Sequence, residues 1–320
     1  MTALPPALRD GLDLMVTEVC RYSERLVSLR MRAADERPLP SYVPGSHLAV
    51  ACGDGINAYS LTGSGLYPER YAVSVRLDAA GAGGSVAMHR LRPGDVLRSS
   101  RPRSQFAPVA QARRHLLLAG GIGVTPILSH ARAAHEWGTS ADVLYVHRPG
   151  EGIHAAELRE LAGPQLSVAC LTSREAFGRA LRGRLAGSPL GTHLYACGPE
   201  PFMEAVLRAA REHGWPEGRL HAESFGAASL DPGEPFGVKL PDGTRIPVPA
   251  GVSLLEALES AGRAVPNMCR QGVCGQCALT VTAGRPLHRD HYLTEAEKEE
   301  NRLIMSCVSR SLDRELEVRP

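Results

Sequence analysis

The chain has 320 residues, of which 43% are hydrophobic and 22% charged, and its formal net charge is +2. This length is enough for two or three domains with their own hydrophobic cores. So small a charge bias argues against a nucleic acid or a membrane surface as partner. The longest apolar run, residues 116–124, contains three glycines, and it falls well short of the ~20 residues that cross a bilayer.

The first part of the chain, residues 13–111, predicts an antiparallel β-barrel. Apolar and polar residues alternate there, as in residues 26–31 and 71–77, and Gly and Pro interrupt the alternation. A period of two that is broken by turn residues is typical of the short strands of a barrel.

Two motifs in this part are consistent with a flavin site. In the run from Asn57 to Leu61, Tyr59 can lie along a flavin ring while Ser60 hydrogen-bonds the ring edge. Gly84 and Ser85 precede a helical stretch over 86–90, and backbone N–H groups at such a place can bind a phosphate. Alone, a Tyr-Ser pair carries little weight and a glycine run fits a hairpin turn, so the flavin interpretation depends on the motifs that follow.

The middle part, residues 112–226, predicts a parallel α/β sheet. We expect strands and helices to alternate, because strands that alternate with helices imply right-handed crossovers. The expected strands are 116–119, 143–146, 166–171 and 193–197, and the expected helices are 126–137, 157–161 and 199–213.

Two strand-to-helix turns of this sheet predict a dinucleotide site. One carries Gly120, Gly121 and Gly123 before Thr125 and Pro126, and the other is Cys197-Gly198-Pro199. Glycines let the backbone approach a pyrophosphate, and two such turns at carboxyl ends of strands form the crevice where these sheets bind ligands. Arg148 follows another strand and can reach a ribose or phosphate; an ordinary solvated arginine is an equally weighted alternative.

The last part contains the most specific motif of the chain. A linker over 227–236 leads to residues 237–320, where Cys269, Cys274 and Cys277 form C-x4-C-x2-C and Cys307 follows after 29 residues. This is the spacing of a plant-type [2Fe–2S] cluster, whereas structural zinc sites usually pair their cysteines. Two helices are expected after capping boxes at 253–256 and 294–297. His288 and His291 lack a third ligand, so surface or hydrogen-bonded histidines are favoured over a metal site.

The four other cysteines show no pairing pattern, and no secretory-type segment precedes them: they are Cys20, Cys52, Cys170 and Cys197. We therefore expect reduced thiols and a cytoplasmic location.

With these motifs in this order, nearly the whole chain resembles the phthalate dioxygenase reductase family. The motifs are N-A-Y-S-L, G-G-S, G-G-I-G-V-T-P, C-G-P, E-S-F-G, C-x4-C-x2-C, H-R-D and M-S-C-V-S-R. The resemblance implies a multidomain reductase with a flavin barrel, a nucleotide domain and a β-grasp ferredoxin domain. Within the family, the chain is most similar to the reductase components of carnitine-type and demethylating monooxygenases.

The resemblance also implies cofactors and their contacts. FMN would contact Asn57, Tyr59, Ser60, Val75, Arg76, Gly84, Ser85 and Thr125, with Phe225 covering the ring. NADH would contact Gly120, Gly121, Gly123, Pro126, Arg148, Cys197, Gly198 and Pro199, and NADPH stays open. One departure is Asn57, where the wider family has arginine; an asparagine cannot make a bidentate charged contact with phosphate, which argues against FAD.

The implied function is electron transfer from NADH through FMN and the cluster to a Rieske-type oxygenase, with no catalytic acid, base or nucleophile and a monomeric chain. The cofactors supply the redox chemistry, and the protein supplies orientation. Two alternatives remain at this point: a stand-alone reductase or oxidase of small acceptors, and a ferredoxin-like module with a degenerate flavin site.

Overall fold

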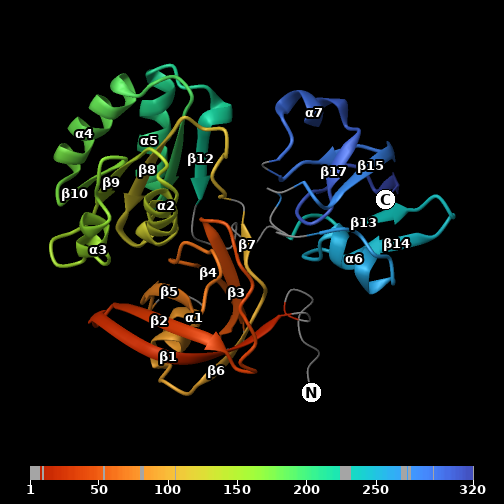
Figure 1. The fold of residues 1–320 in the computed structure, drawn as a ribbon, viewed down its shortest axis with the longest axis horizontal. Helices are drawn as coiled ribbons and strands as arrows, with labels where there is room; N and C mark the ends of the chain where they lie inside the picture. The colour runs from red at the N-terminus through yellow and green to blue at the C-terminus, as the bar shows by residue number, and fades with distance from the viewer. Residues whose placement is uncertain are drawn as a thin grey trace.

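The computed structural model describes residues 8, 11–52, 55–79, 83–104, 106–223, 232–267, 272, 275–290 and 292–319. Three bodies follow one another along the chain (Figure 1). They are an antiparallel barrel, a parallel sheet covered by helices, and a smaller mixed sheet, so the predicted fold class is confirmed. The predicted boundaries at 111, 226 and 236 stay predictions.

The barrel is an antiparallel sheet in the order β4-β3-β6-β1-β2-β5, with β7 paired to β3. A bridge between Leu61, just after β4, and Val73 of β5 joins its two ends. The barrel therefore nearly closes at the segments that carry the flavin motif. Its elements are β1 (Leu12–Ser23), β2 (Leu26–Ala33), β3 (Ser46–Cys52), β4 (Gly55–Ser60), β5 (Tyr71–Arg76), α1 (Gly84–Arg90), β6 (Val96–Ser99) and β7 (Arg103–Ser104).

The second sheet is parallel throughout, in the order β10-β9-β8-β11-β12. The strand order reverses between β8 and β11, which are the strands before the two predicted nucleotide turns. Ligands bind at such a switch point. The strands are β8 (Arg114–Gly120), β9 (Ala141–Val146), β10 (Leu166–Leu171), β11 (Thr192–Cys197) and β12 (Leu220–Glu223).

Helices cover both faces of this sheet. Side chains of α2 and α3 share one buried cluster with Leu117 of β8, and those of α4 and α5 share another with Leu116. Successive residues of one strand thus face opposite layers. The helical elements are η2 (Gly121–Gly123), α2 (Val124–Trp137), α3 (Ala155–Glu160), α4 (Arg174–Gly187), α5 (Glu200–Glu212) and η3 (Glu217–Arg219).

Helix α4 is an element that the sequence analysis did not predict. It contains three glycines, which disfavour helix. Its signals were present: Ser173 caps it through the amide of Ala176, and Phe177, Leu181 and Leu185 are buried at a spacing of four. Tertiary packing of that stripe outweighs the glycines.

The third body is a mixed sheet in the order β14-β13-β19-β15-β17, with β16 paired to β18. Both predicted capping boxes are confirmed, at Ser253 for α6 and at Thr294 for α7. Its elements are β13 (Phe236–Lys239), β14 (Arg245–Val248), α6 (Leu254–Ser260), β15 (Ala278–Ala283), β16 (Pro286–Leu287), α7 (Glu295–Glu300), β17 (Leu303–Met305), β18 (Arg310–Ser311) and β19 (Glu315–Arg319). Among the described residues, no helix is long and apolar enough to span a membrane.

Candidate functional site

The predicted flavin residues of the barrel lie together. A Cβ on Gly84, the first residue of α1, would lie 2.6 Å from the side-chain nitrogen of Asn57. Gly83 caps this helix in a left-handed conformation, with φ of 88°. Residues 83–84 therefore open a helix rather than a hairpin turn, and a side chain at 84 would displace the amide of Asn57 from its present place.

Polar groups at this place fit a flavin. The hydroxyl of Tyr59 is buried and makes no hydrogen bond of normal geometry, although the side chains of Cys52 and Asn57 lie close to it. A buried hydroxyl that is only weakly satisfied in this way fits a place where a ligand binds. The side chain of Ser85 is occupied, because its Oγ donates to the carbonyl of Asp78 and accepts from the amide of that residue. A phosphate here would consequently meet backbone N–H groups of α1.

Strand β5 forms one wall of the same region. Val75 is buried, Arg76 is exposed, and the carbonyl of Val75 lies 3.2 Å from Nε2 of His89 on α1. The strand also contacts η2, the glycine turn of the nucleotide sheet. Ser60 is buried at the end of β4. The flavin and nucleotide motifs are thus neighbours in space.

The two glycine turns of the parallel sheet pack directly on each other. A Cβ on Gly123 would lie 2.2 Å from the carbonyl oxygen of Cys197, and one on Gly198 would lie 3.1 Å from the Cα of Gly120. Neither turn tolerates a side chain at these places. The ring of Phe202 packs against both turns, at 2.9 Å from a Cβ on Gly120 and 2.6 Å from one on Gly198. Glycines here keep the backbone of the turns open to close approach by a pyrophosphate.

Residues beside these turns are buried and fixed. Thr125 donates its hydroxyl to the carbonyl of Ile122, and Pro126 is buried in the first turn of α2. Cys197 is fully buried, and its burial raises the pKa of its thiol well above the usual value. Phe225 lies outside the described residues, whereas Arg148 is exposed after β9.

Glu223 is a residue that the sequence analysis quoted in E-S-F-G but did not propose for the site. It pairs in register with Cys197 at the carboxyl ends of β12 and β11. One carboxylate oxygen is buried without a hydrogen-bond partner, and burial raises the pKa of Glu223 to about 8. A carboxyl group that holds its proton to higher pH than usual therefore stands beside the crevice.

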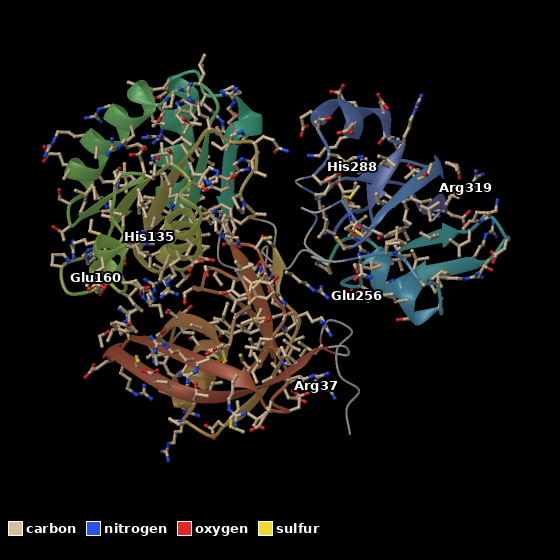
Figure 2. All side chains as sticks on the ribbon, viewed as in Figure 1. Arg37, His135, Glu160, Glu256, His288 and Arg319 are labelled. Carbon is tan, nitrogen blue, oxygen red and sulfur yellow. The ribbon has the colours of Figure 1, made fainter. Side chains whose placement is uncertain are left out.

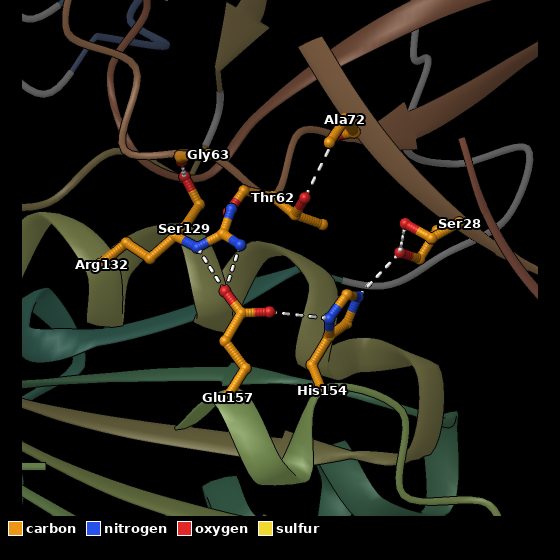
Figure 3. Close-up of polar contacts among 9 residues, drawn as sticks. Ser28, Thr62, Gly63, Ala72, Ser129, Arg132, His154 and Glu157 are labelled. Carbon is orange, nitrogen blue, oxygen red and sulfur yellow. Dashed lines mark hydrogen bonds and ion pairs between the residues drawn. The ribbon is translucent and has the colours of Figure 1, made fainter. Parts of the chain in front are cut away.

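One face of α2 binds the barrel behind this site (Figure 3). Ser129 donates to the carbonyl of Gly63 at 2.5 Å, and Arg132 donates to the carbonyl of Thr62 at 2.7 Å. Thr125, Ser129 and Arg132 are spaced by four and three residues, so they share that face. The helix that begins at the nucleotide turn thus also holds Thr62 and Gly63, which directly follow the flavin motif.

Glu157 and His154 continue this network (Figure 3). Arg132 pairs with one oxygen of Glu157, and the other oxygen lies 3.2 Å from Nδ1 of His154. Nε2 of His154 lies 2.8 Å from the hydroxyl of Ser74 on β5, which reaches Ser28 on β2. Burial pushes the pKa of Glu157 up, but His154 and Arg132 together hold it below its usual value.

Two of the four predicted cluster cysteines are described, and they lie together. The sulfurs of Cys277 and Cys307 are 3.1 Å apart and buried, and their hydrogen bond lowers the pKa of Cys277. Thiolates are the form that binds iron, so this pair fits two ligands of one metal atom. Cys269 and Cys274 lie outside the described residues, and within the described part no three metal-type side chains cluster.

Contrary to the expectation from the sequence, His288 is neither on the open surface nor hydrogen-bonded: it is half-buried, and neither ring nitrogen has a hydrogen-bond partner among the described residues. Its side chain is 10% exposed, and Nδ1 lies 3.6 Å from Oδ1 of the buried Asp290. Asp290 also accepts from the hydroxyl of Ser309 and packs under Gly272, within the cysteine loop. His288 is therefore half-buried beside Asp290, which supports this loop. His291 lies outside the described residues.

Comparisons with known proteins agree with these sites. A profile described as "Dimethylamine monooxygenase subunit DmmA-like, N-terminal domain" matches residues 96–220, and one described as "2Fe-2S iron-sulfur cluster binding domain" matches residues 238–312. The "Heme-dependent oxidative N-demethylase beta subunit" of Ectopseudomonas mendocina is 40% identical over 85% of this chain and 87% of its own length. The "Carnitine monooxygenase reductase subunit" of Acinetobacter baumannii is 33% identical over 94% of this chain and 96% of its own.

Solved structures give the same result. Phthalate dioxygenase reductase superposes with a TM-score of 0.62 at 31% identity, covering 99% of this chain and 100% of that one. CYP116B46 from Tepidiphilus thermophilus matches with a TM-score of 0.66 at 35% identity, covering 99% of this chain and 43% of that one. The fold and site define a flavin-type reductase joined to a ferredoxin. The chain belongs to the phthalate dioxygenase reductase family of oxygenase reductase subunits.

Proposed function

We propose that the chain is an NADH-dependent reductase that passes electrons through FMN and a [2Fe–2S] cluster to a Rieske-type oxygenase acting in demethylation or carnitine-like oxidation. The contact between the flavin segments and the nucleotide turn carries this proposal, since hydride transfer needs the two rings to stack. The names of the relatives, which include a vanillate O-demethylase oxidoreductase at 35% identity, support the substrate class.

FMN is preferred over FAD because of Asn57. Its neutral amide packs against Gly84, where an arginine could hold a pyrophosphate. Chromatography of the flavin released from the purified protein tests this point, and FAD would contradict it. We propose that FMN contacts Asn57, Tyr59, Ser60, Val75, Arg76, Gly84, Ser85, Thr125 and Phe225.

NADH is preferred as donor, and we propose Gly120, Gly121, Gly123, Pro126, Arg148, Cys197, Gly198 and Pro199 as its contacts. Arg148 is exposed, and a guanidinium can bind the 2′-phosphate that distinguishes NADPH from NADH. Arg148 is therefore the residue that would favour the binding of NADPH. If Arg148→Gln weakens the binding of NADPH and leaves the binding of NADH unchanged, Arg148 lies at the ribose. Equal effects on the binding of both cofactors would show that Arg148 does not contact the ribose.

The cluster would be held by Cys269, Cys274, Cys277 and Cys307, and when bound it stores one electron at a time. We further propose three units with boundaries at 111, 226 and 236. A cytoplasmic location is proposed because Cys20, Cys52, Cys170 and Cys197 are free thiols.

A haem-dependent demethylase component is a second candidate for the acceptor. The relative with 40% identity carries that description, and the profile over residues 96–220 is of a dimethylamine monooxygenase subunit. Reconstitution tests the proposal: NADH-dependent turnover is measured with a purified Rieske oxygenase or with a haem-dependent demethylase subunit. Turnover with small acceptors but with neither protein would contradict it.

A further inference from the structure

We propose that the ion pair between Arg103 and Glu256 holds the ferredoxin-type unit against the barrel in the orientation from which its cluster receives electrons. This inference rests on the proposed function. Nη2 of Arg103 on β7 lies 2.7 Å from Oε1 of Glu256 on α6, and the side chains are 34% and 24% exposed. Figure 2 shows Glu256 on the side of the third body that faces the barrel.

The acidic partner is fixed before the arginine reaches it. Oε2 of Glu256 accepts from the amide and the hydroxyl of Ser253, at 2.8 and 2.9 Å, as part of the capping box of α6. Oε1 is therefore left to face Arg103. A carboxylate that is already held loses little side-chain entropy on pairing, which removes one reason why surface ion pairs are weak.

The basic partner is held by the barrel. Arg103 pairs in register with His47 of β3, and the next pair of that ladder is Ser104 with Ser46. His47 is buried. The guanidinium is consequently carried by a strand of the barrel rather than by a free loop.

A short series of hydrogen bonds connects this contact with the two described cluster cysteines. The amide of Leu255, next to Glu256, donates to the carbonyl of Ser306 at 2.9 Å. The amide and hydroxyl of Ser306 both donate to the carbonyl of Cys277, at 3.1 and 2.9 Å. Ser306 directly precedes Cys307. The ion pair thus positions both described cluster cysteines relative to the barrel.

The transfer itself balances simply. When bound, NADH would supply two electrons and one proton as a hydride, and the cluster would take the two electrons one at a time. The one proton would go to water, and no bond of the chain forms or breaks. Arg103 and Glu256 act as positioning residues.

Neutral variants test this role without removing the helix cap. Glu256→Gln keeps a side chain that can close a capping box but loses the charge; Arg103→Gln loses the partner charge. We expect flavin bleaching by NADH in stopped flow to be unchanged, and bleaching of the cluster to slow by about twofold to fivefold. Arg103→Glu should slow it further, because like charges then face each other.

Small-angle scattering of the full chain gives a readout besides activity. The maximum dimension should increase in Arg103→Glu and, at high salt, in the wild type. Arg263→Gln is the control, because Arg263 pairs with Asp242 at 2.6 Å inside the third body. Thr294→Ala removes the equivalent capping box of α7 and leaves the ion pair untouched, so it separates loss of a helix cap from loss of the ion pair.

The outcomes are distinct. Unchanged cluster bleaching and unchanged scattering in Arg103→Glu would overturn the inference, as would equal slowing in Arg263→Gln or Thr294→Ala. Slowed flavin bleaching in Arg103→Gln would also overturn it, because the contact would then act on the whole fold. Absence of flavin bleaching in the wild type would instead refute the proposed function.

Discussion

The barrel has two contact regions, one with the nucleotide sheet and one with the ferredoxin-type unit. These two joints are built differently. Toward the nucleotide sheet, Leu26 and Phe106 share a buried cluster with α2, and polar bonds from Ser129, Arg132 and His154 surround it. Toward the ferredoxin-type unit, the described contact argued above is one partly exposed ion pair. An apolar core with satisfied polar bonds is rigid, whereas a single ion pair is weak and sensitive to salt.

This difference matches what each joint has to do. Hydride transfer requires donor and acceptor atoms in near contact, and small misplacements reduce the rate strongly. A single electron can tunnel across a gap between two cofactors, so a looser joint is tolerated there. The looser joint also leaves the cluster unit free to meet an external acceptor.

Loss of a cluster ligand should have the largest effect on activity. It should abolish electron transfer beyond the looser joint and leave flavin reduction at the tight joint intact. In Cys307→Ser, one thiolate of the buried pair is lost, and we expect no electron delivery to an oxygenase while flavin reduction stays within about twofold. Absorbance and electron paramagnetic resonance after NADH addition measure both. Cys170→Ser is the control, and collapse of flavin reduction in Cys307→Ser with an intact fold would contradict the separation.

A methyl group at the nucleotide turns should damage the tight joint nearly as much. In Gly123→Ala the new Cβ would meet the carbonyl oxygen of Cys197 at 2.2 Å, which forces the two turns apart. We expect kcat/KM for NADH to fall about 100-fold, because misplacement of the reacting groups is costly. Gly183→Ala is the matched control, since a Cβ there meets nothing within 4 Å. Comparable losses in both variants would exclude a local effect.

Removal of Arg132 should weaken the same joint from behind. Arg132→Gln breaks the ion pair with Glu157 and the bond to the carbonyl of Thr62, and it leaves the carboxylate without its charged partner. We expect about 1–3 kcal/mol lower stability and slower flavin reduction, seen by urea unfolding and stopped flow. Arg179→Gln, which removes an exposed pair with Glu175, should change neither; stability equal to wild type in Arg132→Gln would refute the role.

Sequence patterns were sufficient for what depends on neighbours in the chain. The strand-to-helix turns at Gly120 and Cys197 and the caps at Ser253 and Thr294 were predicted because each is a local motif with a physical requirement. Helix α4 was missed because its glycines masked a stripe of Phe177, Leu181 and Leu185.

Contacts between distant segments could not be predicted in the same way. Arg103 and Glu256 are separated by 153 positions, and neither belongs to a motif. The placement of His154 against Ser74 depends on how two domains dock. Glu223 was visible within E-S-F-G, but only its register with Cys197 shows that it stands beside the crevice.

The smallest expected difference between the joints is in how stability depends on acid pH. Each joint contains one buried histidine that determines this dependence. Burial lowers the pKa of His130, on α2 at the tight joint, to about 3, and burial with Arg103 nearby lowers the pKa of His47, at the looser joint, to about 4. In the unfolded chain both titrate near the ordinary value of about 6.5. The unfolded state therefore binds more protons as pH falls below that value, and stability present at neutral pH is lost.

For each histidine the loss approaches about 1.4 kcal/mol per pH unit below pH 6.5, down to its folded pKa. Since the pKa of His130 lies lower than that of His47, its contribution should continue to decrease between pH 4 and 3. His130→Gln retains a side-chain N–H for the carbonyl of Phe106 and should flatten the acid limb of the unfolding free energy measured by urea titration. His135→Gln, at an exposed site, should leave it unchanged, and an equally steep limb in His130→Gln would show that the tight joint is not the acid-sensitive one.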